Sequence, residues 1–185
     1  MIIAAVGKNA SGKDYFLEYI AREFDIPMLS VGDIVRELAE IEGVPKTRES
    51  LHAVSQKYMG MFGQDFFPRR LVEKIKENGY KDVLISGLRP PSDVESFREN
   101  FGNEFYLVAI VVESDKTRWQ RTVARGSERD HVTFEEFLEL DKREERLFNV
   151  SKTISMADYT FYRGEFSDDE YHARIKKFFL ETFRK

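Results

Sequence analysis

The sequence predicts an α/β protein built on a five-stranded parallel sheet with helices on both faces. Short apolar runs, which are typical of buried strands, alternate along the chain with segments whose apolar residues recur at helical spacing. The turns after the first three predicted strands also contain glycine close to a charged residue. Because the carboxyl ends of parallel strands meet at one edge of a sheet, turns of this kind predict a ligand site there.

In the first half of the chain, the apolar, β-branched run at 2–6 predicts a strand, and the pattern at 15–24 predicts a helix after it. Residues 26–31 form the second predicted strand, entered through a proline at its edge. Helices follow at about 34–41 and 47–59.

A helix that begins at Asp65 and ends at Asn78 precedes the third strand, 82–86. The fourth strand, 104–113, is the most hydrophobic, as expected for a strand covered on both faces. The remaining elements are a fifth strand at 157–162 and helices at 92–101, 115–125, 133–148 and 167–183.

Polar residues at several helix starts predict N-caps, because their side-chain oxygens accept hydrogen bonds from the first free N–H groups. These caps are Thr47 (or Ser50), Ser92 with Glu95, and Thr133 with Glu136.

Composition restricts the class of protein. A length of 185 residues suits a single domain, placed at 1–185. The absence of cysteine excludes disulfides, and a net charge of −4 argues against binding nucleic acid by bulk electrostatics. The longest apolar run, 105–112, is too short to cross a bilayer, and Met1 leads into a strand with no charged leader. We therefore expect a cytoplasmic protein that binds neither nucleic acid nor membranes.

The stretch between the first strand and its helix carries the strongest chemical signal. Its residues are Gly7, Lys8, Asn9, Ala10, Ser11, Gly12, Lys13 and Asp14. The glycines allow successive backbone N–H groups to surround an anion, and the helix N-terminus adds unpaired donors and partial positive charge. Lys13 can then reach the outer phosphates of a nucleotide. Because a strand precedes the stretch and a helix follows it, we predict a phosphate-binding loop.

Two positions depart from the common form of such a loop. The residue after the lysine usually carries a hydroxyl for magnesium, and here it is Asp14; the neighbouring strand usually ends in an aspartate, and here it ends in Ser86. The two positions together still supply one carboxylate and one hydroxyl, as in the common arrangement, so we interpret Asp14 and Ser86 as a magnesium site. The alternative is that Asp14 only caps the first turn of its helix.

Arginines follow the second and third strands. Arg36 lies one turn into the helix behind Asp33, and Arg89 follows the third strand directly. An arginine at such a place can bind a phosphate bidentately, and Arg69 offers one further cation. The alternatives are that Arg36 faces solvent, that Arg89 pairs with Asp93, and that the segment of Arg69 only packs phenylalanines.

A second group of arginines lies on or just after the helix at 115–125: Arg118, Arg121, Arg125 and Arg129. Arg121 and Arg125 are four residues apart and therefore share a helix face. Phosphoryl transfer needs cations around the transferred group and the exclusion of water, so we interpret 118–150 as a lid. The alternative is a solvated helix whose arginines pair with the acidic helix at 135–145.

Together these motifs resemble the nucleoside monophosphate kinases of the P-loop NTPase class over nearly the whole chain. The pattern Ser-x-Gly-Asp-x-x-Arg at 30–36 is similar to the start of the monophosphate-binding helix in adenylate kinases, and Gly87-Leu88-Arg89 resembles their Gly-Phe-Pro-Arg turn. Arg121 and Arg125 resemble the arginine pair before the adenylate kinase lid, one on adenine and one on phosphate.

Ala157-Asp158-Tyr159 looks like the end of dephospho-coenzyme A kinases and of an adenylate-kinase-related family, which is the best overall match. The Ser-Gly-Lys-Asp loop is also similar to those of animal-type phosphomevalonate kinases and phage deoxynucleoside monophosphate kinases.

The resemblance implies a three-layer P-loop sandwich with a small lid, and ATP or another nucleoside triphosphate with Mg²⁺ as cofactors. The donor would be held by residues 7–14, Arg121 and Arg125, and the acceptor by Asp33, Arg36, Arg69 and Arg89 within a helical segment at 32–78. The residues expected in catalysis are Lys13, Arg89, Arg125 and Arg129.

The activity expected is that of a kinase that moves the γ-phosphate to a phosphate-bearing small molecule, either a nucleotide (NMP or dNMP) or a dephospho-coenzyme-A-like compound. The alternative is a regulatory protein that binds or hydrolyses a nucleotide and has no acceptor. The donor base and the number of chains in the assembly stay open.

Overall fold

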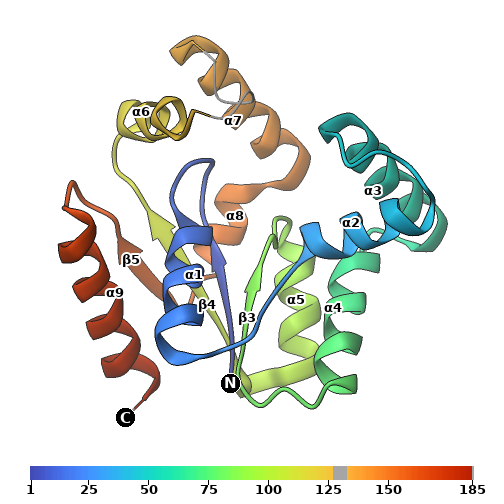
Figure 1. The fold of residues 1–185 in the computed structure, drawn as a ribbon, viewed down its shortest axis with the longest axis horizontal. Coiled ribbons are helices and arrows are strands. Elements are labelled where there is room, and N and C mark those ends of the chain that lie inside the picture. Colours follow the sequence, from blue (N-terminus) through green and yellow to red (C-terminus); the bar gives the residue numbers. More distant parts are fainter. Residues whose placement is uncertain (127–132, 185) are drawn as a thin grey trace.

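The computed structural model describes residues 1–126 and 133–184 and confirms the predicted fold class (Figure 1). The strands are β1 (Ile2–Val6), β2 (Met28–Ser30), β3 (Val83–Ser86), β4 (Phe105–Val111) and β5 (Tyr159–Tyr162). They form one parallel sheet in the order β2-β3-β1-β4-β5, with β1 at its centre. Each strand lies within two residues of its predicted bounds at both ends.

The helices that connect the strands are α1 (Lys13–Phe24), α2 (Val31–Ile41), α3 (Arg48–Phe62), α4 (Phe66–Glu77), α5 (Pro91–Phe101), α6 (Asp115–Arg125), α7 (Phe134–Phe148), α8 (Val150–Ser155) and α9 (Asp168–Phe183). A short 3₁₀ turn, Gly102–Glu104, precedes β4. None of the helices among the described residues is long and apolar enough to span a membrane.

The central strand shows how the sheet divides the core. Ile2, Ala4 and Val6 of β1 pack with residues of α2, α3, α4 and α5, whereas Ile3 and Ala5 pack with residues of α1 and α9. This alternation follows from the strand period of two, and both faces of β1 are at most 2% exposed. The result is three layers, with α1 and α9 on one face of the sheet (Figure 1).

Two of the predicted helix starts are confirmed, and one is wrong. The Thr47 side chain accepts from the Ser50 backbone N–H, and Thr133 forms a complete capping box with Glu136. The box predicted for Ser92 does not form, because α5 begins one residue earlier and Pro90 occupies the N-cap position. Prolines are favoured at this end of a helix, because the first N–H groups have no acceptor within the helix and the N–H that proline lacks costs no hydrogen bond.

Candidate functional site

The loop at 7–12 leaves β1 at the centre of the sheet and leads into α1 (Figure 1). A side chain at Gly7 would place its Cβ 2.6 Å from the carbonyl oxygen of Ile110, so only glycine fits. Gly12 has a φ of 86°, in the left-handed region that favours glycine. The sequence therefore needs both glycines to bring the start of α1 to the carboxyl end of β1.

The start of α1 is suited to an anion. Its N-cap is Gly12, so no side chain occupies the first N–H groups, and Lys13 stands at the first helical position. The hydroxyl of Ser11 is buried without a hydrogen-bond partner among the described residues. A cradle that a Cβ would fill, an uncapped helix start and an unpaired hydroxyl all fit a bound phosphate group.

The structure brings Asp14 and Ser86 together. The Ser86 hydroxyl, at the end of β3, donates to Oδ1 of Asp14, which lies in the first turn of α1. The N-cap of α1 is Gly12, and Asp14 is the acidic residue of the first turn, where a carboxylate is favourable, so the alternative that Asp14 only stabilises this helix start stays open. Asp14 is also 3.9 Å from the ammonium of Lys13 and keeps 53% of its side chain exposed.

This pair fits one side of a magnesium site. No group of three or more acidic or histidine side chains suited to a metal occurs in the described ranges. Magnesium commonly takes one or two carboxylates and completes its shell with phosphate oxygens and water. The metal role of Asp14 and Ser86 accordingly depends on a phosphate ligand, and it stays a prediction.

On the side of β2, Asp33 and Arg36 form an exposed ion pair with a separation of 2.5 Å. Asp33 also accepts a hydrogen bond from Ser30, the residue that caps α2. Although burial raises the pKa of Asp33, the hydrogen bonds from Ser30 and Arg36 bring it below its ordinary value. The carboxylate therefore holds Arg36 beside the carboxyl end of the sheet.

Arg89 follows β3 and reaches the predicted lid. Its guanidinium pairs with Glu144 of α7 at 2.9 Å and lies 5.3 Å from the ring centre of Phe148. Asp93 accepts a hydrogen bond from the backbone N–H of Arg89 at 3.0 Å, not from its guanidinium. Asp93 thus stabilises the turn after β3 through a backbone hydrogen bond, whereas Glu144 forms the ion pair with the guanidinium of Arg89.

Arg69 lies in the first turn of α4. It pairs with Asp65 at 3.0 Å and donates to the Phe62 carbonyl at 2.7 Å, at the junction of α3 and α4. These contacts stabilise the junction, and a role for Arg69 in acceptor binding stays a prediction.

Arg118 does not line the site as a free cation. It is 1% exposed, donates to the carbonyl of Asn9 at 2.8 Å, and forms ion pairs with Asp115 and Asp141. Asn9 in turn donates to Asp141 of α7 at 3.1 Å. For this residue the alternative of pairing with the acidic helix is therefore correct, and Arg118 fastens the loop to α6 and α7.

Arg121 extends from α6 to the turn after β5, where it donates to the carbonyl of Gly164 at 3.1 Å. Arg125 ends α6, but its side chain lies outside the part of the chain that the structure describes. Arg129 lies outside the described residues altogether. The roles expected of Arg125 and Arg129 therefore stay predictions.

Sequence reasoning missed Arg163, the residue after β5. Its guanidinium lies over the ring of Tyr171 at 4.4 Å and near that of Tyr15 at 5.3 Å. A Cβ added at Gly12 would meet Nη1 of Arg163 at 1.9 Å, so the side chain rests against the loop. The signal was available, because Arg163 and Gly164 form an arginine-bearing turn after a strand, as at Arg89.

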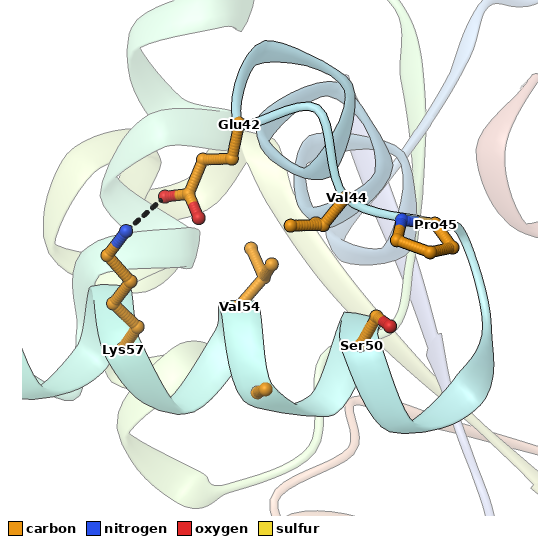
Figure 2. Close-up of a pocket in the computed structure, with 7 residues that line it drawn as sticks. Glu42, Val44, Pro45, Ser50, Val54 and Lys57 are labelled. Carbon is orange, nitrogen blue, oxygen red and sulfur yellow. Dashed lines mark hydrogen bonds and ion pairs between the residues drawn. The ribbon is translucent and has the colours of Figure 1, made fainter.

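A hollow of about 240 Å³ lies within the helical segment at 32–78, between the end of α2 and α3 (Figure 2). Val44 and Val54 line it, and Lys57 at its edge pairs with Glu42 at 2.7 Å (Figure 2). Val44, Pro45, Ala53 and Val54 make most of its lining apolar, so this hollow differs from the arginine-bearing turns after β2 and β3.

A glycine-bounded loop with its lysine, set between the central strand of a parallel sheet and a helix, defines a P-loop protein with a kinase-like fold. The chain belongs to the AAA domain family, whose model matches residues 6–137, and it also belongs with the UPF0200 proteins.

A UPF0200 protein of Pyrococcus horikoshii is 35% identical over 181 residues, which cover 96% of this chain and 95% of the relative. One of Pyrococcus furiosus is 36% identical over 188 residues, covering 99% and 98%.

Among solved structures, shikimate kinase from Bacteroides thetaiotaomicron is similar, with a TM-score of 0.64 and 14% identity, covering 100% of this chain and 99% of that one. A protein from Thermus thermophilus has a TM-score of 0.67 and 16% identity, covering 99% and 97%. At this level of identity the likeness shows the fold alone.

Proposed function

We propose that this protein is an ATP-dependent kinase that transfers the γ-phosphate to a phosphate-bearing small molecule, a nucleotide (NMP or dNMP) or a dephospho-coenzyme-A-like compound. The observation that carries the proposal is the placement of cations on both sides of the loop. Arg36 and Arg89 follow β2 and β3 on one side of β1, and Arg121 reaches the end of β5 on the other. Two sets of cations flanking one phosphate loop suit two anionic substrates.

Each residue then has a distinct task. The loop amides and Lys13 bind the β- and γ-phosphates of the donor, and Arg121 with Arg125 and Arg129 binds from the lid side. Arg36 and Arg89 orient the acceptor by its phosphate. Asp14 and Ser86 would hold magnesium, which neutralises charge on the outer phosphates when bound.

The ion pairs seen on the acceptor side are compatible with this role. Arg36 and Arg89 are each about half exposed, with 48% and 49% of the side chain accessible, so exchanging a carboxylate partner for a phosphate costs little. A phosphate offers more negative charge than a carboxylate and can also be bound bidentately. A cytoplasmic location, where small phosphorylated metabolites and ATP occur together, belongs to the same proposal.

Binding of a bisubstrate compound tests the proposal. Calorimetry with magnesium should show that P1,P5-di(adenosine) pentaphosphate, or the analogue for another acceptor, binds far more tightly than ATP. A screen with radiolabelled ATP against nucleoside monophosphates, dephospho-coenzyme A and phosphomevalonate should then label one acceptor.

Lys13→Ala is the control, because it should abolish ATP binding and labelling without unfolding the protein. Equal affinities for ATP and the bisubstrate compounds, with no labelled acceptor, would instead indicate a nucleotide-binding or NTP-hydrolysing regulator.

A further inference from the structure

The guanidinium groups of Arg121 and Arg163 and the hydroxyl of Tyr171 meet beside the loop. Nη2 of Arg121 donates to the carbonyl of Gly164 at 3.1 Å, but other donors of this cluster lack an acceptor. Nη1 of Arg121 and the hydroxyl of Tyr171 are both buried and have no hydrogen-bond partner among the described residues. The guanidinium of Arg163, a partly buried residue, lies against two aromatic rings and the backbone at Gly12.

The electrostatics of the cluster indicate that these groups are close together. Burial lowers the pKa of Arg121, and the charge of Arg163 lowers it further. Burial raises the pKa of Tyr171 to about 12, while both arginines oppose this rise. Glu165 also faces Arg121, but it accepts a hydrogen bond from Thr117 at 3.5 Å and forms no ion pair with either arginine within the described ranges.

Such an arrangement is costly unless something else completes it. Two guanidinium groups repel one another, and an unpaired buried donor forfeits its hydrogen bonds to water. The start of α1 adds further positive potential, because Gly12 is its N-cap and no side chain caps it. What the cluster lacks is an anion with several acceptor oxygens.

The topology indicates which anion this is. Lys13 and the pair Asp14–Ser86 lie toward β3, the side of the acceptor arginines, whereas Arg163 follows β5 at the opposite edge of the sheet. A triphosphate that extends along the loop with its γ-phosphate toward β3 has its α-phosphate toward β5.

We infer that Arg163, backed by Arg121 and Tyr171, binds the α-phosphate of the donor nucleotide. This inference rests on the proposed function and adds to it a phosphate-binding side chain, Arg163, that is not among the predicted site residues. An anion at Arg163 also neutralises the charge that Arg121 faces.

Calorimetry on Arg163→Ala, with ATP and with ADP at a fixed magnesium concentration, tests the inference. A charge-assisted hydrogen bond is lost, so the affinity should fall at least about tenfold. Because ATP and ADP share the α-phosphate, the loss should be equal for both. Arg163→Lys keeps the charge but not the planar fork and should recover part of the affinity.

Arg174→Ala is the matched control. Arg174 also stacks on an aromatic ring near this turn, at 4.4 Å from the centre of Phe166, but it lies on α9. Its loss should change nucleotide affinity by less than about twofold. Arg163→Gln, which keeps a planar polar group over the rings, replaces Arg163→Ala if the alanine variant fails to fold.

The outcomes separate this inference from the proposed function. If wild-type protein binds ATP and Arg163→Ala binds it equally well, Arg163 is not a donor ligand, while the kinase proposal stands. A loss seen with ATP but not with ADP would place Arg163 at the γ-phosphate and overturn the inference. If wild-type protein binds neither nucleotide, both are wrong.

Discussion

Arg89, at the end of β3, and Glu144, in α7, form an ion pair with 2.9 Å between Nη1 and Oε1. The pair joins the acceptor side of the site to the predicted lid. An acceptor phosphate at Arg89 and the carboxylate of Glu144 would compete for the charge of one guanidinium.

Arg36→Ala and Arg89→Ala should each raise the KM for the acceptor at least about tenfold and leave the affinity for ATP within about twofold, because a charge-assisted contact to one substrate is lost. Arg121→Ala should show the reverse pattern. Glu144→Gln should lower the acceptor KM by up to about fivefold, since an exposed pair is weak. Steady-state kinetics measures all four, and equal losses for both substrates would contradict this division.

Asp14→Asn should raise the magnesium concentration needed for activity at least about tenfold, a loss of about 1.4 kcal/mol. Asparagine can still accept the hydrogen bond from Ser86 but no longer offers a negative charge to the metal. The double variant Asp14→Ser, Ser86→Asp should recover part of the loss. An unchanged magnesium titration in Asp14→Asn would mean that another carboxylate serves the metal, with Asp33 the first to test.

Arg118→Met should lower the free energy of unfolding by about 3–5 kcal/mol, because removing one partner leaves Asp141 and Asp115 without their cation. Lys142→Met breaks an exposed pair with Glu139 on the same helix and should cost less than about 1 kcal/mol. Urea unfolding compares the two variants. Equal, small losses would show that the buried network contributes nothing to stability.

Asp93 predicts a pH dependence of stability. Burial raises its pKa from 3.8 to about 6, although the hydrogen bond from the backbone N–H of Arg89 acts to lower the pKa. Between these two values the native state holds a proton that the unfolded state has released, so stability falls as pH rises.

Ionisation of the buried Asp93 carboxyl lowers the free energy of unfolding. This loss is absent below about pH 4 and complete above about pH 6, where it reaches about 2–3 kcal/mol. The stability of wild type relative to Asp93→Asn should therefore be greater at pH 4 than at pH 7, measured by urea unfolding at each pH. A difference independent of pH would show that Asp93 has an ordinary pKa in the folded protein.

Local patterns predicted the fold well, because strands buried on both faces and capped helices are encoded by neighbouring residues. Thr133 and Glu136 are three positions apart, and their capping box forms as predicted. The helix α8 was missed because its six residues make fewer than two turns, too few to show a recurring apolar pattern, and because it follows directly on the left-handed Asn149 that ends α7.

The site was predictable where it depends on the order of strands and not where it depends on distant contacts. Asp14 and Ser86 were paired from the sequence because β3 neighbours β1, and they do form a hydrogen bond. Spacing grouped Arg118 with Arg121, but contacts with Asn9 and Asp141, which lie on other elements, hold Arg118 inward. Likewise, no local pattern connects Arg163 with Gly12.

The hydrogen bonds from Asn9 and Arg118 to Asp141 limit how this protein can be re-engineered. A chimera that replaces the segment after α6 with that of a protein with the same fold would discard Asp141 and leave the buried guanidinium of Arg118 without this partner beside the loop at 7–12. Exchanging that segment therefore requires changing Arg118 and Asn9 as well. The unit that can be transplanted is the segment together with these two residues.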